Sequence, residues 1–145
     1  HPPGAARVSA GGMGGLFFVG HQSGGGVFVF DLGLDGGVAF VGGYFTARDD
    51  TSGLSFDAGT NRLYVWHGES NDLEIVRLSS QPTGSARALD TEYLFDWPGS
   101  DNIEGVAVFP VSDCGAHGLR RLALIEDDGY DESIRLFDDW PLCAP

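Results

Sequence analysis

The sequence has no lysine and only eight basic residues, all of them arginine, against 21 acidic residues. Its formal net charge is −13 at pH 7. Surfaces that bind nucleic acids or anionic membranes need clustered lysine and arginine, so we expect neither partner. No apolar run approaches the roughly 20 residues that a membrane-spanning helix needs, so no membrane span is expected. The acidic excess fits a secreted protein, and it fits a simple requirement for solubility equally well.

Cysteine is also scarce, with Cys114 and Cys143 as the only two in the chain. Neither a CxxC spacing nor a neighbouring pair of cysteine and histidine indicates a zinc site. The two residues are therefore either a disulfide or two ordinary thiols. We expect the disulfide, which would stabilise the fold by about 3.5 kcal/mol through loop closure. Such a bond is typical of an extracellular or periplasmic protein.

What the sequence does contain is a series of short, alternating apolar runs bounded by glycine, aspartate, asparagine or serine. Each run has the usual length of a β-strand. No window carries an apolar face at helical spacing, and 23 glycines spread along the chain disfavour helices. We therefore expect an all-β fold. The predicted strands lie near residues 16–20, 27–32, 38–45, 53–57, 62–67, 73–78, 88–96, 104–109, 121–126 and 133–138.

These runs repeat. The segment Phe17–His21 matches Leu63–His67, and the strands that follow the two segments keep the same offset of about 46 residues. A third copy begins at Leu122–Glu126, after an inserted loop at Pro110–Gly118 that carries one cysteine. A repeat of this length, built from successive short strands, is typical of the four-stranded blade of a β-propeller.

The repeat predicts the organisation of the chain. A flexible leader is expected at 1–15, followed by a partial propeller at 16–145. Its blades are expected at about 16–48, 49–98 and 99–145. Because a closed propeller usually has four to eight blades, about three blades correspond to half of a six-bladed ring. A second copy, or a missing segment of a longer parent chain, would then have to complete the ring.

Two segments carry a family resemblance. Asp101–Val108 and Arg121–Asp128 resemble the blade pattern of secreted six-bladed propellers, in which an inner strand begins with Glu-Gly-hydrophobic and the next ends in an acidic cluster. β-Propeller phytases, phytase-like esterases, SdiA-regulated proteins and the senescence-marker/gluconolactonase families share this pattern. The resemblance covers about residues 14–140. It implies that Glu104 faces the central channel, at the mouth where calcium is commonly bound.

The acidic residues near that mouth predict a calcium site. Because side chains alternate along a strand, Asn102 and Glu104 share one face. In a propeller, the loops that carry Glu69, Asp127 and Asp128 lie at the same end of the ring. Calcium takes six to eight oxygen ligands, and these five residues are our candidate ligands. The alternative is a solvated acidic rim without a cation.

The histidines and tryptophans are further candidates for functional residues. His21 and His67 occupy the same place in consecutive repeats, at the channel mouth, where they could act as ligands, as general bases or as structural loop caps. Trp66, Trp97 and Trp140 could stack on a glycan or a partner. They could equally pack between adjacent blades.

Two functions follow from these observations. The first is a secreted, acidic propeller module that binds a small molecule, a glycan or a protein partner, or assembles with itself, with calcium at the channel mouth. The second is a calcium-dependent hydrolase of the phytase-like or lactonase-like kind, in which the cation polarises a phosphoryl or carbonyl oxygen and Glu104 is a ligand or a base. Because the chain holds only about half of a ring, we favour the binding module over the hydrolase.

Overall fold

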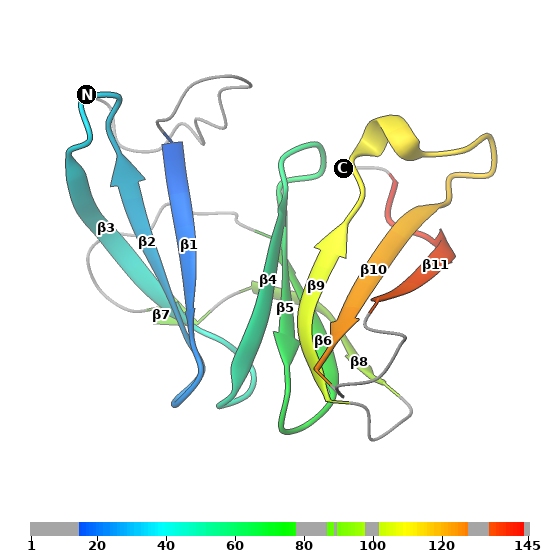
Figure 1. Cartoon of the computed structure of the whole chain (residues 1–145), viewed down its shortest axis with the longest axis horizontal. Coiled ribbons are helices and arrows are strands. Elements are labelled where there is room, and N and C mark those ends of the chain that lie inside the picture. Colours follow the sequence, from blue (N-terminus) through cyan, green and yellow to red (C-terminus); the bar gives the residue numbers. More distant parts are fainter. Residues whose placement is uncertain (1–14, 78–86, 89, 98–101, 128–133, 144–145) are drawn as a thin grey trace.

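The computed structural model describes most of the chain, and its secondary structure there is almost wholly β (Figure 1). The one exception is a single 3-10 turn, η1 (Val111–Asp113). The all-β prediction is therefore confirmed. No helix in the described part is long and apolar enough to cross a membrane. The described residues are 15–77, 87–88, 90–97, 102–127 and 134–143.

The strands form three sheets, which we name A, B and C in chain order. Sheet A contains β1 (Gly15–His21), β2 (Gly26–Leu32), β3 (Val38–Phe45) and the short β7 (Arg87–Ala88). Sheet B contains β4 (Thr51–Asp57), β5 (Arg62–His67), β6 (Asp72–Arg77) and β8 (Asp90–Asp96). Sheet C contains β9 (Ile103–Val108), β10 (Arg120–Glu126) and β11 (Ile134–Trp140). Neighbouring strands are antiparallel except for β3 and β7, which are parallel.

The strands lie within a few residues of their predicted positions, with one difference. The single strand expected at 88–96 is two strands: β7 pairs with β3 in sheet A, and β8 pairs with β6 in sheet B. Local alternation marks a segment as extended but does not identify its neighbour, which is why the division was missed. The predicted leader lies outside the described residues except for Gly15, and the division into blades stays a prediction.

The three sheets lie face to face in the order A, B, C (Figure 1). A first apolar cluster fills the space between sheets A and B, where Phe18 of β1 meets Phe56 of β4 at 5.3 Å between ring centroids. A second and larger cluster fills the space between sheets B and C. Its buried members are Tyr64, Trp66, Leu73, Ile75, Ile103, Val106, Leu122, Leu124 and Trp140.

Glycine sets the distance between sheets B and C. A Cβ placed on Gly53 of β4 would lie 2.9 Å from the Cα of Gly105 in β9, closer than real contacts allow. One hydrogen bond also joins the two strands: the Val108 amide donates to Ser55 Oγ at 3.1 Å. Gly53 and Gly105 lie on the first strands of sheets B and C, so the first strands of the two sheets meet at this close approach.

Candidate functional site

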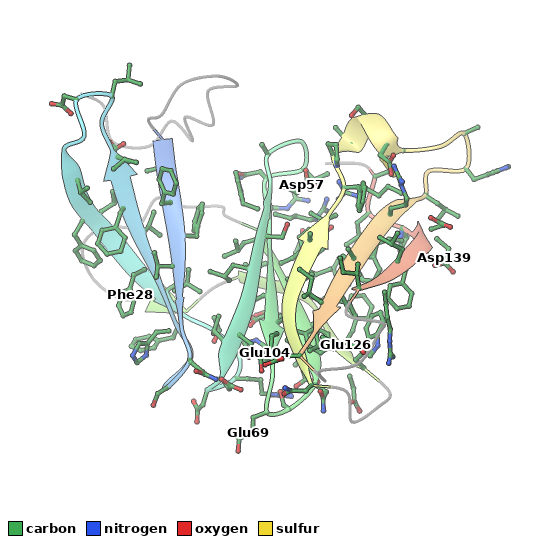
Figure 2. All side chains as sticks on the ribbon, viewed as in Figure 1. Phe28, Asp57, Glu69, Glu104, Glu126 and Asp139 are labelled. Carbon is green, nitrogen blue, oxygen red and sulfur yellow. A yellow bond between two sulfur atoms is a disulfide. The ribbon has the colours of Figure 1, made fainter. Side chains whose placement is uncertain are left out.

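Acidic side chains gather at the end of the sheets where β5 and β10 finish and β9 begins. Figure 2 shows Glu69, Glu104 and Glu126 at this end, and Asp57 at the opposite end of sheet B. Glu69 and Glu104 are exposed, whereas Glu126 is buried and forms an ion pair with Arg135. The end predicted to be the channel mouth is therefore acidic and partly solvated.

Two of the predicted calcium ligands are in direct contact. The Asn102 side-chain amide donates to the Asp127 carbonyl oxygen at 3.0 Å, and the Asp127 amide donates to the Asn102 carbonyl oxygen at 2.9 Å. This reciprocal pair joins the start of β9 to the end of β10. Both side chains remain exposed at the acidic end.

The other predicted ligands stand apart from this pair or cannot be placed. The Glu69 amide donates to Asp50 Oδ2 at 2.8 Å, which fixes the β5–β6 loop, while the Glu69 side chain is exposed. Asp128 lies outside the described residues. Within the part of the chain that the structure describes, no three His, Cys, Asp or Glu side chains form a group that could hold a metal ion. The calcium site stays a prediction.

His67 lies inside the protein, fully buried between sheets A and B. Its Nε2 is 2.9 Å from Glu74 Oε2, and its Nδ1 is 3.2 Å from the carbonyl oxygen of Asp50. Glu74 is also fully buried and accepts two further hydrogen bonds, from the Ala47 amide at 2.9 Å and from Thr91 Oγ1 at 2.5 Å. The pair therefore anchors the β3–β4 loop, which connects the two sheets.

The charge state of Glu74 follows from these contacts. Burial raises the pKa of the Glu74 carboxyl, but the hydrogen bonds from His67, Thr91 and the Ala47 amide outweigh burial and hold that pKa below its ordinary value. His21, at the corresponding place in sheet A, is exposed instead, with its ring 6.0 Å from that of Phe28. The two histidines thus share a sequence position but not an environment.

A second buried polar group lies at the opposite end, between sheets B and C. Arg120 Nη2 donates to Asp57 Oδ2 at 2.6 Å and to the Tyr64 hydroxyl at 3.0 Å, and Nη1 donates to the Phe109 carbonyl oxygen at 3.0 Å. Trp140 Nε1 also donates to the Tyr64 hydroxyl, at 3.3 Å. Because all these partners belong to elements that pack on each other, the group fixes the register of sheet C on sheet B.

The pKa values of both acidic groups in that network, the Asp57 carboxyl and the Tyr64 hydroxyl, are shifted. Burial raises the pKa of Asp57, but hydrogen bonds from Arg120 and Thr60, together with the Arg120 charge, hold it below its ordinary value. Burial raises the pKa of the Tyr64 hydroxyl, and the Trp140 and Arg120 contacts only partly oppose the rise. Asp57, Glu74 and Arg120 were not among the predicted site residues. Their sequence signal is a charged residue in or beside an apolar run.

The tryptophans pack between sheets B and C. Of the two predicted roles, stacking on a ligand and packing between neighbouring sheets, the structure shows the second. Trp66 is fully buried, with its ring 6.1 Å from that of Trp97, and Trp97 contacts Phe137 of β11 at 5.1 Å. Trp140 packs against Phe95 of β8 at 5.5 Å. The three indoles therefore hold the two sheets together and do not form an exposed stacking platform.

Cys114 and Cys143 form a disulfide, as predicted, with their Cα atoms 5.9 Å apart. The bond ties the inserted loop between β9 and β10 to the segment that follows β11. Beside it, the Arg121 guanidinium lies 4.3 Å above the Phe109 ring and pairs with Asp113 at 2.5 Å. These contacts hold the loop against sheet C.

Among the residues that the structure describes, two apolar sheet faces remain uncovered, one at each end of the array. On sheet A, Phe17, Val19, Val38 and Phe40 are each about half exposed or more. On sheet C, Ile125, Ile134 and Leu136 are exposed to a similar degree. In the intervening sheet B, β5 and β6 are buried on both faces, whereas β8 leaves Tyr93 and Leu94 exposed. These end faces and the acidic end are the two features of the described surface that could engage a ligand.

Comparison with known proteins adds no family: no protein-family model matches the chain, and no curated protein is a significant match.

Proposed function

We propose that the chain is a β-propeller module, that its three sheets are consecutive blades, and that it works by binding another protein through its apolar end faces. Three features support the arrangement as blades. The first three strands of each sheet are consecutive in the chain, the sheets begin in chain order, and they stack face to face with β4 beside β9. Each blade of a propeller buries its faces against its neighbours in this way.

The observation that carries the binding role is the exposure of large apolar side chains on both outermost sheets. Phe17 is 49% exposed and Leu136 is 57% exposed, and each lies among other apolar residues. Monomeric proteins rarely expose contiguous apolar patches larger than a few hundred Å², and larger patches mark interaction sites. Burying such surface gains roughly 25 cal/mol for each Å² removed from water.

We place this module outside the cytoplasm, in the extracellular space or the periplasm. The Cys114–Cys143 bond supports that location, because disulfides persist in oxidising compartments. The acidic composition is compatible with it.

Calcium belongs to the proposal as a ligand of the acidic end. Asn102 and Asp127 are joined there, and Glu104 and Glu69 are exposed at the same end (Figure 2). Carboxylate, amide and carbonyl oxygens are the ligands that calcium prefers. A phytase-like or lactonase-like hydrolase remains the alternative function, but no specific contact in the described residues favours it over the module.

Assays of the purified chain distinguish the module from the hydrolase. Phosphate release from phytate and hydrolysis of aldonolactones would be measured with added calcium and with a chelator. The module predicts no turnover above background under either condition. Turnover that the chelator abolishes and that Glu104→Gln removes, while the exposed control Asp139→Asn retains it, would establish the hydrolase and overturn the proposal.

A further inference from the structure

The uncovered face of sheet A is apolar at every strand position except its last row. Cross-strand pairing places Phe17 beside Phe30 and Phe30 beside Phe40, so the three rings share one face. Phe28 and Val19 form the next row, and Figure 2 shows Phe28 on the side of sheet A away from sheets B and C. We call this surface the front face of sheet A. It consists of Phe17, Val19, Phe28, Phe30, Leu32, Val38 and Phe40.

The uncovered face of sheet C is also apolar, but its residues are smaller. Pairing places Ala107, Ala123 and Leu136 in one row and Gly105, Ile125 and Ile134 in the next. The alternate residues of the same strands, such as Leu122 and Leu124, are buried against sheet B. We call this surface the back face of sheet C. It consists of Gly105, Ala107, Ala123, Ile125, Ile134 and Leu136.

Each interface inside the chain joins a back face to a front face. The back face of sheet A, with Phe18 and Val27, packs on the front face of sheet B, with Leu63 and Val65. The opposite face of sheet B, its back face, packs on the front face of sheet C. The chain is therefore left with one free front face and one free back face, and these are the two types that its own packing joins.

Residues at corresponding places in the repeat are buried in sheet B but exposed on the free faces. Leu63 of sheet B corresponds to Phe17 in the repeat, and it is fully buried where Phe17 is 49% exposed. Ile75 of sheet B corresponds to Leu136, and it is fully buried where Leu136 is 57% exposed. Positions that are buried in the internal sheet are thus open at both ends of the array.

We propose that a second copy of this chain covers both faces, with the front face of sheet A of each copy packed on the back face of sheet C of the other. The two surfaces are complementary in size, because four phenylalanines face a surface that includes Gly105, Ala107 and Ala123. The residues that define the two faces are uncharged, although the chain has a net charge of −13. One acidic residue, Asp138, lies two residues after Leu136 on β11 and is exposed at the edge of the back face. The interface is heterologous, and two such contacts close a ring of six sheets, as head-to-tail contacts do when the rotation closes. The inference rests on the proposed function, since it treats the sheets as blades.

The test is a complementation experiment between two variants. Phe17→Asp places a charge on the front face only, and Leu136→Asp places one on the back face only. In a ring of either variant alone, both interfaces carry one buried charge. In a mixed ring, one interface carries both changes and the other is unmodified. Val111→Asp, at an exposed apolar residue outside both faces, is the matched control.

Light scattering coupled to size-exclusion chromatography gives the mass. The wild type and the Val111→Asp control are expected at twice the 15.4 kDa of one chain. Each face variant alone is expected at the single-chain mass, and an equimolar mixture of the two is expected to recover the two-chain mass. Recovery in the mixture also shows that both variants are folded.

Three results would overturn the proposal. A wild type that has the mass of a single chain at micromolar concentration would show that a second copy does not cover the faces. Some other protein or further blades would then cover them, and the propeller-module proposal would still hold. Leu136→Asp that still forms dimers, beside monomeric Phe17→Asp, would indicate front-to-front pairing. Face variants that show native circular dichroism but do not associate when mixed would exclude the back-on-front contact.

Discussion

Asp57→Asn removes the negative charge from the buried polar group that fixes sheet C on sheet B. In the wild type, Asp57 Oδ2 accepts hydrogen bonds from Arg120 and Thr60, and Oδ1 accepts one from the Gly59 amide at 3.0 Å. The Arg120 side chain is fully buried. After the substitution its guanidinium would keep the Tyr64 hydroxyl and the Phe109 carbonyl as partners, with no carboxylate to balance its charge.

The expected cost is large because breaking one side of a buried ion pair leaves an uncompensated charge, which typically costs about 3–5 kcal/mol. A domain of this size has a free energy of unfolding of roughly 5–15 kcal/mol, so the variant would lose a substantial part of its stability. Replacing both partners, as in Asp57→Leu with Arg120→Met, removes the charge together with its counterion. We expect that double variant to be more stable than Asp57→Asn.

Urea denaturation followed by tryptophan fluorescence provides the assay, because Trp66, Trp97 and Trp140 all lie in the space between sheets B and C. The pH dependence adds a second readout. The pKa of Asp57 is lowered in the folded state from its ordinary 3.8, so its stabilising contribution is present above that value and is lost as pH falls through the folded-state pKa. The difference between wild type and Asp57→Asn should therefore shrink in acid. A cost below about 1 kcal/mol at neutral pH, the level of a surface pair, would refute the reasoning.

Three further predictions address other parts of the molecule. His67→Ala should lower the free energy of unfolding by about 3 kcal/mol in urea titrations, because it leaves a buried carboxylate without its ring donor, and an unchanged midpoint would contradict this. Reducing the bond between Cys114 and Cys143 should cost about 3.5 kcal/mol, measured by denaturation with and without reductant, and no change would show that the loop is held by other contacts. Calcium titrated by calorimetry should bind to the wild type and to Asp139→Asn but not to Glu104→Gln, with all three equally stable; equal binding by all three would exclude the predicted site.

Most of the strands could be predicted from local patterns in the sequence, and the disulfide could be predicted from the presence of only two cysteines. Alternating apolar residues define a strand with one face toward a core, and turn residues define its ends. Asn61 and Asn71, for example, follow the pattern: both have φ of 55° in the tight turns that flank β5, a conformation that asparagine tolerates better than most residues. With two cysteines, only one intramolecular pairing is possible.

The buried polar groups could not be predicted, because elements distant in sequence bury them and complete their hydrogen bonds. Asp57 meets Arg120 only when β4 packs beside sheet C, and His67 meets Glu74 beneath a loop whose path no local pattern reports. For the same reason, the equivalence of His21 and His67 in the repeat suggested a shared role that their environments do not support. Sequence position in a repeat fixes the strand, whereas neighbouring sheets decide whether a side chain is buried.

The central claim is that the two uncovered faces belong together in a ring of two chains. A crystal structure of the associated protein tests it most directly, since it shows which residues of one copy touch which residues of the other. We predict six sheets in a closed ring, with Phe17 of one chain packed against the surface around Leu136 of its partner at both junctions. A structure in which the two front faces pair with each other, or in which both faces remain open to solvent, would contradict the account.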